Sequence, residues 1–525
     1  MWLYADISTV SDIPRHYGRT TPEKVALVDD QRSLSFGELD RLTSQMAHRL
    51  VQDGVREGDV VAFFGKNSIP YFLTLFAASK AGATLLPLNW RLTPVELSAI
   101  IDDARPAIVF VDEAFVPTLQ ATLERCQHRM PHQVVQPEAG ASGALERYFG
   151  DAPAADPGLP SDPRHTAWLM YTSGTTGLGK GVEISHQALN LMRLSEHLEP
   201  ALQWRADDSL MMVMPNFHLL GTALPIQALY NGCTVSMMPM LEPGRLLELL
   251  GSTRPTILVL APTVIQMMLD HPKAGEADLS SLRLIMYAGS AINAQLLKRA
   301  LTEISGCRFM QFYGTTECVG PMCILRPEQH DLVNEARLKS CGTPMPLVDF
   351  KVLDEQGREV PDGEKGELVI RTPAMFTRYR NQPELTAQVL ERGWYRTGDA
   401  GYRDPKDGLM YIVDRIKDMI VTGGENVYSA EVEQAVQRHP GVSMAAVIAV
   451  PDPKWGERVT AVVVRKAGAA LEEAELIAHC RTQLAGYKVP KQVVFAESLP
   501  VSPAGKVLKR VLRETYWSGL DRAVA

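Results

Sequence analysis

A loop of glycines and hydroxyl residues directly after an apolar run constrains this chain more than any other stretch. Residues 167–170 read Ala-Trp-Leu-Met, and residues 171–180 read Tyr-Thr-Ser-Gly-Thr-Thr-Gly-Leu-Gly-Lys. Glycines let a backbone approach an anion with its N–H groups pointing at it, while hydroxyls and a lysine add donors and positive charge. The pattern predicts a buried strand that ends in a grip on the β- and γ-phosphates of a nucleotide. The alternative is an ordinary flexible loop.

This loop differs from the phosphate loop of the Walker A type. Gly174, Gly179 and Lys180 match the first seven positions of that motif. At the eighth position Gly181 replaces the serine or threonine that ligates Mg²⁺. The hydroxyl residues are clustered before the lysine instead. The loop therefore indicates a nucleotide enzyme of another class.

The composition excludes several kinds of partner. The chain has 525 residues, which is too long for one hydrophobic core and predicts two or more domains. Its net charge is −8 without a basic tract, so we expect no nucleic-acid partner and no anionic membrane surface. No apolar run is long enough to span a membrane, and the first six residues lack the plan of a signal peptide. Seven scattered cysteines without a Cys-x-x-Cys pair indicate reduced thiols and predict a cytoplasmic protein.

Strands alternate with helices through most of the chain. Capping boxes at Ser35 and Glu38, and at Thr93 and Glu96, each predict the start of a helix. Residues 136–163, which are rich in proline, glycine and alanine, predict a surface excursion. The alternation predicts parallel sheets with crossover helices, the α/β class. Strands are expected at 60–64, 84–88, 107–111, 256–261, 282–287 and 309–313.

The pattern changes in the last third of the chain. Segments 349–353 and 367–371, on either side of a turn-rich stretch, predict antiparallel strands. From residue 428 the order helix, strand, strand, helix, strand and short helix predicts an α+β module of about 100 residues. We expect the short helix to begin at Lys506. The expected domains are 1–413 and 418–525, joined by a hinge at 414–417.

Five further stretches carry polar residues suited to a nucleotide. Glu317 comes directly after three hydroxyl or glycine residues and suits a hard cation that bridges phosphate oxygens. Asp399 suits a ribose, because one carboxylate can accept hydrogen bonds from two adjacent hydroxyls. Taken singly, each stretch could be a packed histidine, a turn or a surface lysine. The stretches are Pro-Asn-Phe-His-Leu-Leu-Gly at 215–221, Tyr-Ala-Gly-Ser at 287–290, Gln-Phe-Tyr-Gly-Thr-Thr-Glu at 311–317, Trp-Tyr-Arg-Thr-Gly-Asp at 394–399 with Asp-Arg-Ile-Lys following at 414–417, and Pro-Val-Ser-Pro-Ala-Gly-Lys at 500–506.

In type and order these stretches, with the phosphate loop, resemble the adenylate-forming superfamily. That superfamily includes acyl-CoA synthetases, the adenylation domains of peptide synthetases and beetle luciferases. The resemblance covers nearly the whole chain, although the family's usual loop has a proline where this chain has Gly179. It implies an α/β fold: a large N-terminal domain of mixed parallel sheets with crossover helices and a β-barrel-like subdomain, and a small C-terminal α+β domain joined by a hinge.

The resemblance also assigns roles to individual residues. Catalytic roles fall on Thr316 near the α-phosphate, Glu317 on the metal, His218 beside the acyl carboxylate, and Lys506. Lys417 is the hinge residue, and Mg²⁺ is expected at Glu317 and Thr176. CoA is expected at Gly423, Gly424 and Glu425, and the acyl group at Leu219, Leu220 and Val319. The residues expected to bind ATP are Thr172, Ser173, Gly174, Thr175, Thr176, Gly177, Lys180, Ala288, Gly289, Ser290, Gln311, Phe312, Tyr313, Gly314, Thr315, Asp399 and Arg415.

The implied activity is a two-step ligation with ATP, Mg²⁺ and coenzyme A. A carboxylate attacks the α-phosphorus of ATP, pyrophosphate leaves, and a thiol then attacks the acyl adenylate. His218 stands where amino-acid-activating domains carry an aspartate, so an amino acid is not expected. No carrier domain follows Lys506, so free CoA is the expected acceptor and a fatty or aryl acid the expected substrate.

Several alternatives stay open. The acceptor could be a carrier protein, or the chain could be a luciferase-like oxygenase. A non-catalytic nucleotide-binding scaffold would be expected to lose Lys506, Glu317 or Asp399, and all three are present. Two protein partners also stay open: a second copy of the chain, and a protein acetyltransferase acting on Lys506.

Overall fold

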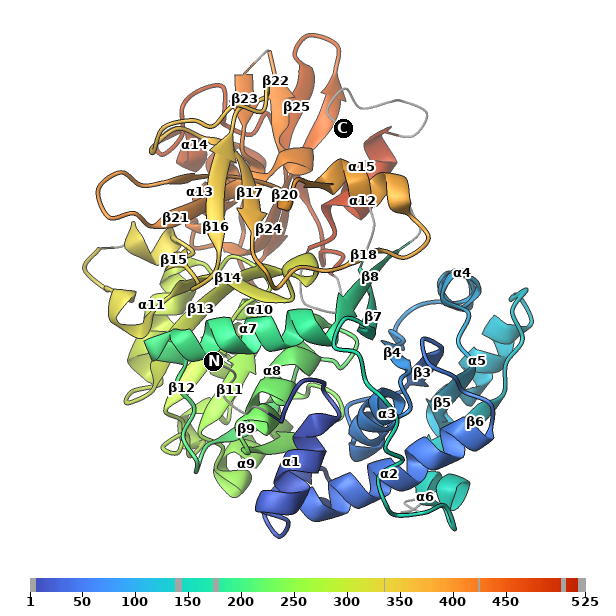
Figure 1. The fold of residues 1–525 in the computed structure, drawn as a ribbon. Helices are drawn as coiled ribbons and strands as arrows, with labels where there is room; N and C mark the ends of the chain where they lie inside the picture. The colour runs from blue at the N-terminus through green and yellow to red at the C-terminus, as the bar shows by residue number, and fades with distance from the viewer. Residues whose placement is uncertain are drawn as a thin grey trace.

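The structure is a computed structural model of the chain, and it describes residues 6–136, 144–172, 179–334, 336–423, 425–501 and 507–517. Of residues 133–136 and 144 only the backbone is described. Seven predicted site residues lie outside the described ranges: Ser173, Gly174, Thr175, Thr176, Gly177, Gly424 and Lys506. Figure 1 shows the course of the chain.

A seven-stranded sheet carries the phosphate loop. Its order is β18-β8-β7-β4-β3-β5-β6, parallel from β7 to β6 and antiparallel where β8 and β18 are added. The strands are β3 (Val60–Phe64), β4 (Thr84–Pro87), β5 (Ile108–Asp112), β6 (His132–Gln136), β7 (Thr166–Thr172), β8 (Lys180–Ser185) and β18 (Arg378–Tyr379). Helix α2 (Phe36–Gln52) precedes β3, and the helices between the strands are α3 (Ile69–Lys80), α4 (Pro94–Ala104), α5 (Val116–Leu123) and α6 (Ala144–Phe149).

A nine-stranded sheet carries most of the remaining predicted site. Its order is β15-β14-β13-β12-β11-β9-β10-β1-β2, and the strands from β13 to β1 are parallel. The strands are β1 (Val25–Val28), β2 (Ser33–Ser35), β9 (Ser209–Met212), β10 (Thr234–Met237), β11 (Ile257–Leu260), β12 (Leu284–Tyr287), β13 (Arg308–Thr315), β14 (Gly320–Leu325) and β15 (Thr343–Pro344). The helices are α1 (Asp12–Thr20), α7 (His186–Leu198), α8 (Leu219–Tyr230), α9 (Pro243–Thr253), α10 (Pro262–Leu269) and α11 (Ala294–Glu303).

The two sheets share one hydrophobic core. Every residue of α3 is buried, as is α8 from Gly221 onward, because both helices lie between apolar layers. A second core joins the nine-stranded sheet to α9, α10 and α11, and another joins the seven-stranded sheet to α4 and α5. The capping boxes predicted for α2 and α4 are both present.

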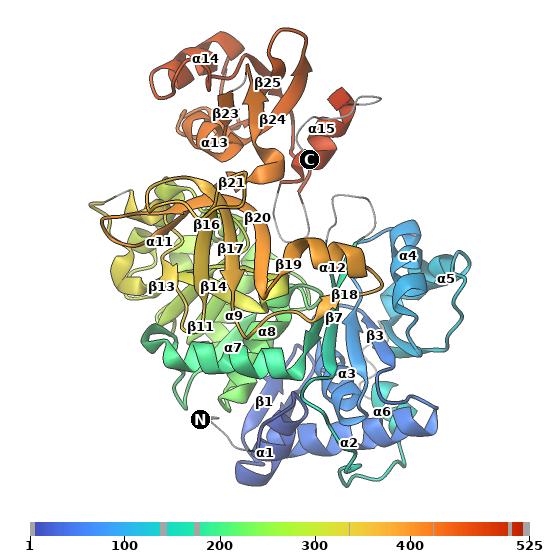
Figure 2. The same ribbon diagram turned by 45° about the horizontal axis from the view of Figure 1, so that its top comes forward.

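An antiparallel sheet and the C-terminal domain complete the chain. The sheet contains β16 (Asp349–Leu353), β17 (Gly366–Arg371), β19 (Leu390–Glu391), β20 (Trp394–Arg403) and β21 (Met410–Arg415), with α12 (Pro383–Val389) beside it. The C-terminal domain contains β22 (Ile420–Thr422), β23 (Glu425–Val427), β24 (Val442–Asp452), β25 (Gly456–Arg465), β26 (Gln492–Phe495), α13 (Ser429–Gln437), α14 (Glu473–Arg481) and α15 (Lys509–Trp517). Figure 2 shows this domain as a separate body above the rest of the chain, as the predicted architecture requires.

Three details differ from the expectations. Strand β8, which follows the predicted phosphate loop and pairs antiparallel with β7 as a hairpin, is not among the expected strands. The predicted surface excursion contains the helix α6, whose Leu145 and Phe149 are buried. The last helix begins at Lys509 and not at Lys506, because Val507 forms a β-bridge with Val501.

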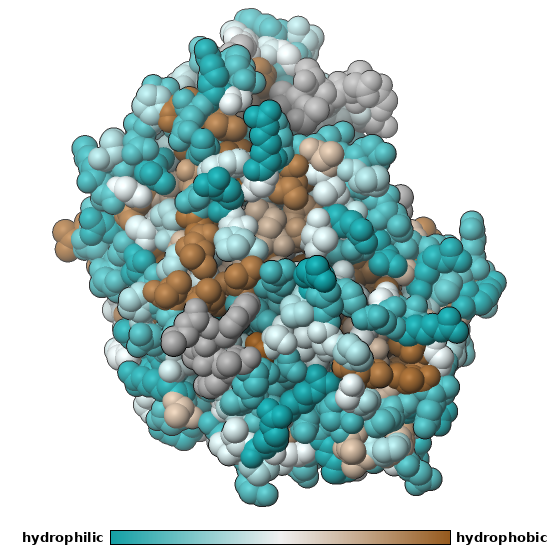
Figure 3. Space-filling model, in the orientation of Figure 1, coloured by the Kyte–Doolittle hydropathy of each residue, from teal (hydrophilic) through white to brown (hydrophobic). Residues whose placement is uncertain are grey.

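The surface in Figure 3 is mostly hydrophilic, with hydrophobic residues in small separate groups. In the described part of the chain, no helix has the length and apolar character to cross a membrane.

Candidate functional site

Lys180 and Glu317 are linked through one tyrosine. Thr172 at the end of β7 pairs with Lys180 at the start of β8, so the two ends of the phosphate loop are fixed. The Lys180 ammonium lies 5.1 Å from the centre of the Tyr379 ring, and the Tyr379 hydroxyl donates a 2.7 Å hydrogen bond to Glu317 Oε1. Tyr379 reaches this position because β18 pairs with β8. The phosphate loop and the predicted metal ligand therefore meet at one place.

The Glu317 carboxylate is almost completely buried. Only 9% of the residue is exposed, and its carbonyl accepts a hydrogen bond from Phe376 N. Burial, with the carboxylate beside it, raises the pKa of Tyr379 well above its ordinary value, so this phenol remains a donor. A buried carboxylate oxygen near a lysine that is predicted to bind phosphate fits the oxygen donors that Mg²⁺ takes together with substrate phosphates.

A second tyrosine–carboxylate pair surrounds Asp399. The Tyr313 hydroxyl donates a 2.6 Å hydrogen bond to Asp399 Oδ2, and Arg415 Nε lies 3.3 Å from Asp399 Oδ1. Asp399 and Arg415 are opposite each other on β20 and β21, so the pairing sets this contact. Burial, followed by Asp399, raises the pKa of Tyr313 well above the ordinary value. The structure thus brings together three residues that lie far apart in the sequence.

The predicted adenine residues follow β12 and β13 at one edge of the sheet. Tyr287 and Gln311 are in register, so Ala288, Gly289 and Ser290 leave the sheet beside Gln311 and Phe312. Gly289 has φ +94, which strains any residue with a side chain. Gln311 Oε1 is buried and has no hydrogen-bond partner among the described residues, which suits a ligand amine.

The turn from β13 to β14 is tightly packed. A Cβ at Gly314 would lie 2.1 Å from Gly320 O, so only glycine fits there. The Thr315 hydroxyl accepts a hydrogen bond from Cys318 N and caps the short 3₁₀ helix Thr316–Cys318. Val319 has φ +63, a rare conformation for a β-branched residue. Such strain clusters at functional sites.

Two of the predicted acyl residues, Leu219 and Leu220, lie at the start of α8, and the third, Val319, follows the 3₁₀ helix Thr316–Cys318. His218 is the residue before α8, and its ring lies 4.7 Å from the Phe217 ring. His218, Leu219 and Leu220 are partly exposed, whereas Val319 is fully buried. A Cβ at Gly221 would lie 2.0 Å from Pro215 O, so this glycine allows the loop to close onto the helix.

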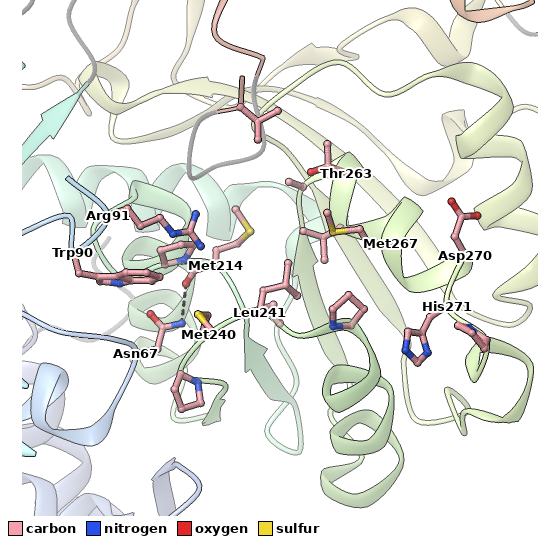
Figure 4. Close-up of a pocket in the computed structure, with 18 residues that line it drawn as sticks. Asn67, Trp90, Arg91, Met214, Met240, Leu241, Thr263, Met267, Asp270 and His271 are labelled. Carbon is pink, nitrogen blue, oxygen red and sulfur yellow. Dashed lines mark hydrogen bonds between the residues drawn. The ribbon is translucent and has the colours of Figure 1, made fainter. Parts of the chain in front are cut away.

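A cavity of about 590 Å³ opens next to the same loop. Figure 4 shows Trp90 and Arg91 at one side and Asp270 and His271 at the other, with three methionines and Leu241 between them. Val501 of the C-terminal domain also lines the cavity, so the cavity lies between the domains. The indole Nε1 of Trp90 is buried and has no hydrogen-bond partner among the described residues. The methionines are Met214, Met240 and Met267.

The residue predicted to act as the hinge, Lys417, lies in the electrostatic environment of Arg415 and Lys180. Burial, and then the nearby charge of Arg415, lowers the pKa of Lys417, and Lys180 also contributes to that shift. Arg513 of α15 lies 2.7 Å from Asp418, and the Ser429 hydroxyl donates a 2.6 Å hydrogen bond to Asp414. These contacts hold Asp414 and Asp418, which lie on either side of Lys417, to helices of the C-terminal domain.

The predicted CoA loop lies in the C-terminal domain. Gly423 has φ +60, and a Cβ there would lie 2.8 Å from Trp455 Cε3. Glu425, on β23, is exposed. Gly424 and Lys506 lie outside the described residues, so their predicted roles remain predictions.

Sequence reasoning missed several residues of this region. Tyr379 lies on a two-residue strand without a motif, and only its pairing with β8 brings it to Glu317. Asn67 and Asn216 were also missed, although each follows a buried strand and a polar residue there is a useful signal. Trp90 and Arg91 lie in the loop after β4, where no spacing rule identifies them.

Comparisons with known proteins agree with this arrangement. The family model for the AMP-binding enzyme matches residues 15–380, and the model for the AMP-binding enzyme C-terminal domain matches residues 431–506. The chain is 35% identical to the fatty acid–[acyl-carrier-protein] ligase ScoC of Streptomyces coeruleorubidus, over 99% of both chains. It is 36% identical to a feruloyl-CoA synthase of Amycolatopsis sp, over 96% of this chain and 98% of that one.

A solved structure gives the same result. The ATP-bound structure of MatB from Rhodopseudomonas palustris superposes with a TM-score of 0.87 at 31% identity, over 97% of this chain and 99% of that one. The chain belongs to the family of AMP-binding enzymes, the adenylate-forming superfamily, and is an ATP-dependent, AMP-forming ligase of the acyl-CoA synthetase type.

Proposed function

We propose that this ligase activates an apolar carboxylic acid, fatty or aryl, and transfers its acyl group to coenzyme A. The observation that supports the assignment of the site most strongly is the pair of tyrosine–carboxylate contacts at Glu317 and Asp399, next to Lys180 and Arg415. The apolar side chains of Leu219 and Leu220 beside His218 favour an apolar acid. Feruloyl-CoA synthase and a fatty acid ligase among the relatives agree with that class.

Each residue of the site has a charge suited to one part of ATP. Asp399 would accept hydrogen bonds from the ribose hydroxyls, and Arg415, whose Nε lies 3.3 Å from Asp399 Oδ1, would orient that carboxylate. Lys180 would neutralise the leaving pyrophosphate, and Lys506 would neutralise charge where the carboxylate meets the α-phosphate. Adenylation of this kind depends on positioning and charge neutralisation, and so needs no protein nucleophile.

Magnesium fits the residues of this site. Glu317 would hold the ion, with Thr176 as the second expected ligand. When bound, the ion supplies charge neutralisation on phosphate oxygens. Tyr379 orients the Glu317 carboxylate through its 2.7 Å hydrogen bond to Oε1.

We further propose that the cavity beside Trp90 receives the pantetheine arm of CoA. The cavity lies between the domains and reaches Pro215, three positions before His218. Its apolar wall suits the arm, Trp90 Nε1 would donate to an amide carbonyl, and Arg91 would attract phosphate. Gly423, Gly424 and Glu425 would close on the arm from the C-terminal domain.

One experiment separates the two acceptors. The protein is incubated with ATP and a panel of fatty and aryl acids, with either CoA or a phosphopantetheinylated carrier protein. Acyl-CoA detected by mass supports the proposal. If acylated carrier protein forms and acyl-CoA does not, the acceptor is a carrier protein and not CoA. The similarity to ScoC favours this second candidate.

Three further proposals concern setting and partners. We propose that the protein acts in the cytoplasm, in fatty-acid or aryl-acid metabolism, and that a homodimer forms, which light scattering would test. We also propose that acetylation of Lys506 would remove its charge and stop adenylation. Mass spectrometry that never finds acetyl-Lys506 under varied carbon sources would count against this modification.

A further inference from the structure

We infer that Asn67 and Asn216 form a positioning pair that fixes the His218 loop and thereby sets the affinity for the acid. This inference rests on the proposed role of His218 beside the acyl carboxylate. Asn67 follows β3 in the seven-stranded sheet, and Asn216 follows β9 in the nine-stranded sheet. The pair therefore joins the two sheets at the edge where the site lies.

The hydrogen bonds of the pair are reciprocal. Asn216 N donates to Asn67 Oδ1 at 2.9 Å, and Asn216 Nδ2 donates to the carbonyls of Gly65 and Lys66, each at 3.1 Å. Asn67 Nδ2 donates to the carbonyls of Met214 at 3.1 Å and Met238 at 3.0 Å. Each side chain thus holds the backbone that follows a strand of the other sheet. Figure 4 shows the contact between Asn67 and Met214 at the wall of the cavity.

Both asparagine side chains are buried, so the loss of their hydrogen bonds would be costly. Asn67 is 2% exposed and Asn216 is 0% exposed, so water cannot replace a lost partner. Leaving a backbone carbonyl unsatisfied in such a place costs more than the hydrogen bond itself gained. If a side-chain amide is removed, the loops either stay in place with unsatisfied carbonyls or shift until these carbonyls accept from another donor.

Further hydrogen bonds connect the asparagine pair to α8. The Asn216 carbonyl accepts a 2.7 Å hydrogen bond from the Thr222 hydroxyl, which also lies 2.6 Å from the Tyr71 hydroxyl of α3. On the other side, Lys66 N donates to Asp112 Oδ2 at 2.8 Å. His218 lies between Asn216 and Thr222, so both ends of its loop are held by this network.

The phosphate-binding residues are outside the network. Lys180, Glu317 and Asp399 have their own contacts, none of which includes Asn67 or Asn216 among those described. A displaced His218 loop should therefore weaken the binding of the acid and leave the binding of ATP unchanged. A merely structural pair would instead lower stability and leave the affinity of the folded enzyme for both substrates unchanged.

The test is acid-dependent pyrophosphate exchange by the full chain, with KM for the acid and for ATP measured separately. For Asn216→Leu we expect the acid KM to rise at least about tenfold, with the ATP KM within about twofold. Asn216→Asp keeps the size of the side chain but loses its two donors, and we expect the same change in the acid KM. This variant takes the place of Asn216→Leu if the leucine variant does not fold. In a double variant Asn67→Ala, Asn216→Ala the acid KM should rise no further than in the worse single variant.

A matched control is Thr74→Val, which removes a fully buried hydroxyl of α3 whose one hydrogen bond among the described residues goes to the Pro70 carbonyl. Its thermal midpoint should fall while both KM values stay unchanged. An unchanged acid KM in the Asn216 variants, or an acid KM that rises only in step with the ATP KM, would overturn the inference. Wild-type protein without pyrophosphate exchange for any acid would instead overturn the proposed function, and the inference with it.

Discussion

At the scale of single residues, the candidate site contains two buried carboxylates, Glu317 and Asp399. Glu317→Gln should lower the rate of adenylation at least about a hundredfold, because an amide cannot supply the charge that holds Mg²⁺ against phosphates. Pyrophosphate exchange over a range of Mg²⁺ concentrations measures this effect. Glu391→Gln, an exposed carboxylate on β19, is the control and should have no effect. A normal rate with unchanged Mg²⁺ dependence would remove Glu317 from the site.

The buried side chain of His186 predicts how the stability of the protein depends on pH. His186 Nδ1 accepts a 3.2 Å hydrogen bond from Val10 N, and burial lowers the pKa of His186 to about 4. In the unfolded chain the ordinary pKa is about 6.5. Its stabilising contribution is therefore present above pH 6.5 and is lost as the pH falls through 4.

The variant His186→Asn keeps an acceptor for Val10 but cannot be protonated. The wild type should lose up to about 3 kcal/mol more of its unfolding free energy than the variant between pH 7 and pH 4. Thermal midpoints across this pH range measure the difference, and His48→Asn, a less buried histidine, is the control. Parallel pH profiles of wild type and His186→Asn would contradict the assignment.

At the scale of elements, local signals predicted most of the fold. Capping boxes placed the starts of α2 and α4, and apolar runs placed β3, β11 and β12 within one or two residues. The pairing of β16 with β17 was also predicted correctly as antiparallel. The hairpin of β7 and β8 was missed, because β8 carries Lys180 and Glu183 within a mainly buried strand, which weakens its apolar pattern.

The loop inside that hairpin has a prediction of its own. Gly179 replaces the proline usual in the family, so Gly179→Pro should stiffen the loop and leave pyrophosphate exchange equal or higher. A Cβ at Gly179 would lie 3.1 Å from Thr172 O, so the end of β7 must yield by a few tenths of an ångström. Gly179→Ala, which adds the Cβ alone, is the control for that contact. A collapse of exchange in the proline variant only would mean that the loop has a geometry foreign to proline.

At the scale of the whole molecule, the site is assembled from both sheets, the antiparallel sheet and the hinge. The motifs predicted which residues belong to it, whereas the contacts of Tyr379, Asn67 and Trp90 depend on pairing and packing between distant segments. The hydrophobic pattern of a single segment cannot predict contacts between segments that are distant in the sequence. The sequence therefore predicts charged residues for the candidate site, but it does not predict the residues that contact them.

The proposed hinge at Lys417 predicts that the two half-reactions are separable by mutation. Lys506 and the loop at Gly424 belong to the same domain, so a rotation about Lys417 would present them alternately. Lys506→Ala should abolish acyl-adenylate formation but still convert supplied acyl adenylate and CoA to thioester. Gly424→Leu should do the reverse, and Lys417→Pro should spare only one half-reaction. Equal losses in both halves for all three variants would exclude domain alternation.

The central claim is that the acid and AMP are joined during the reaction. An acid labelled with heavy oxygen in its carboxylate tests this directly, with the products analysed by mass after complete turnover with ATP and CoA. An acyl adenylate predicts one labelled oxygen in AMP, unlabelled pyrophosphate and one labelled oxygen in the thioester. ADP as the product, or label in a released phosphate in place of AMP, would contradict the account.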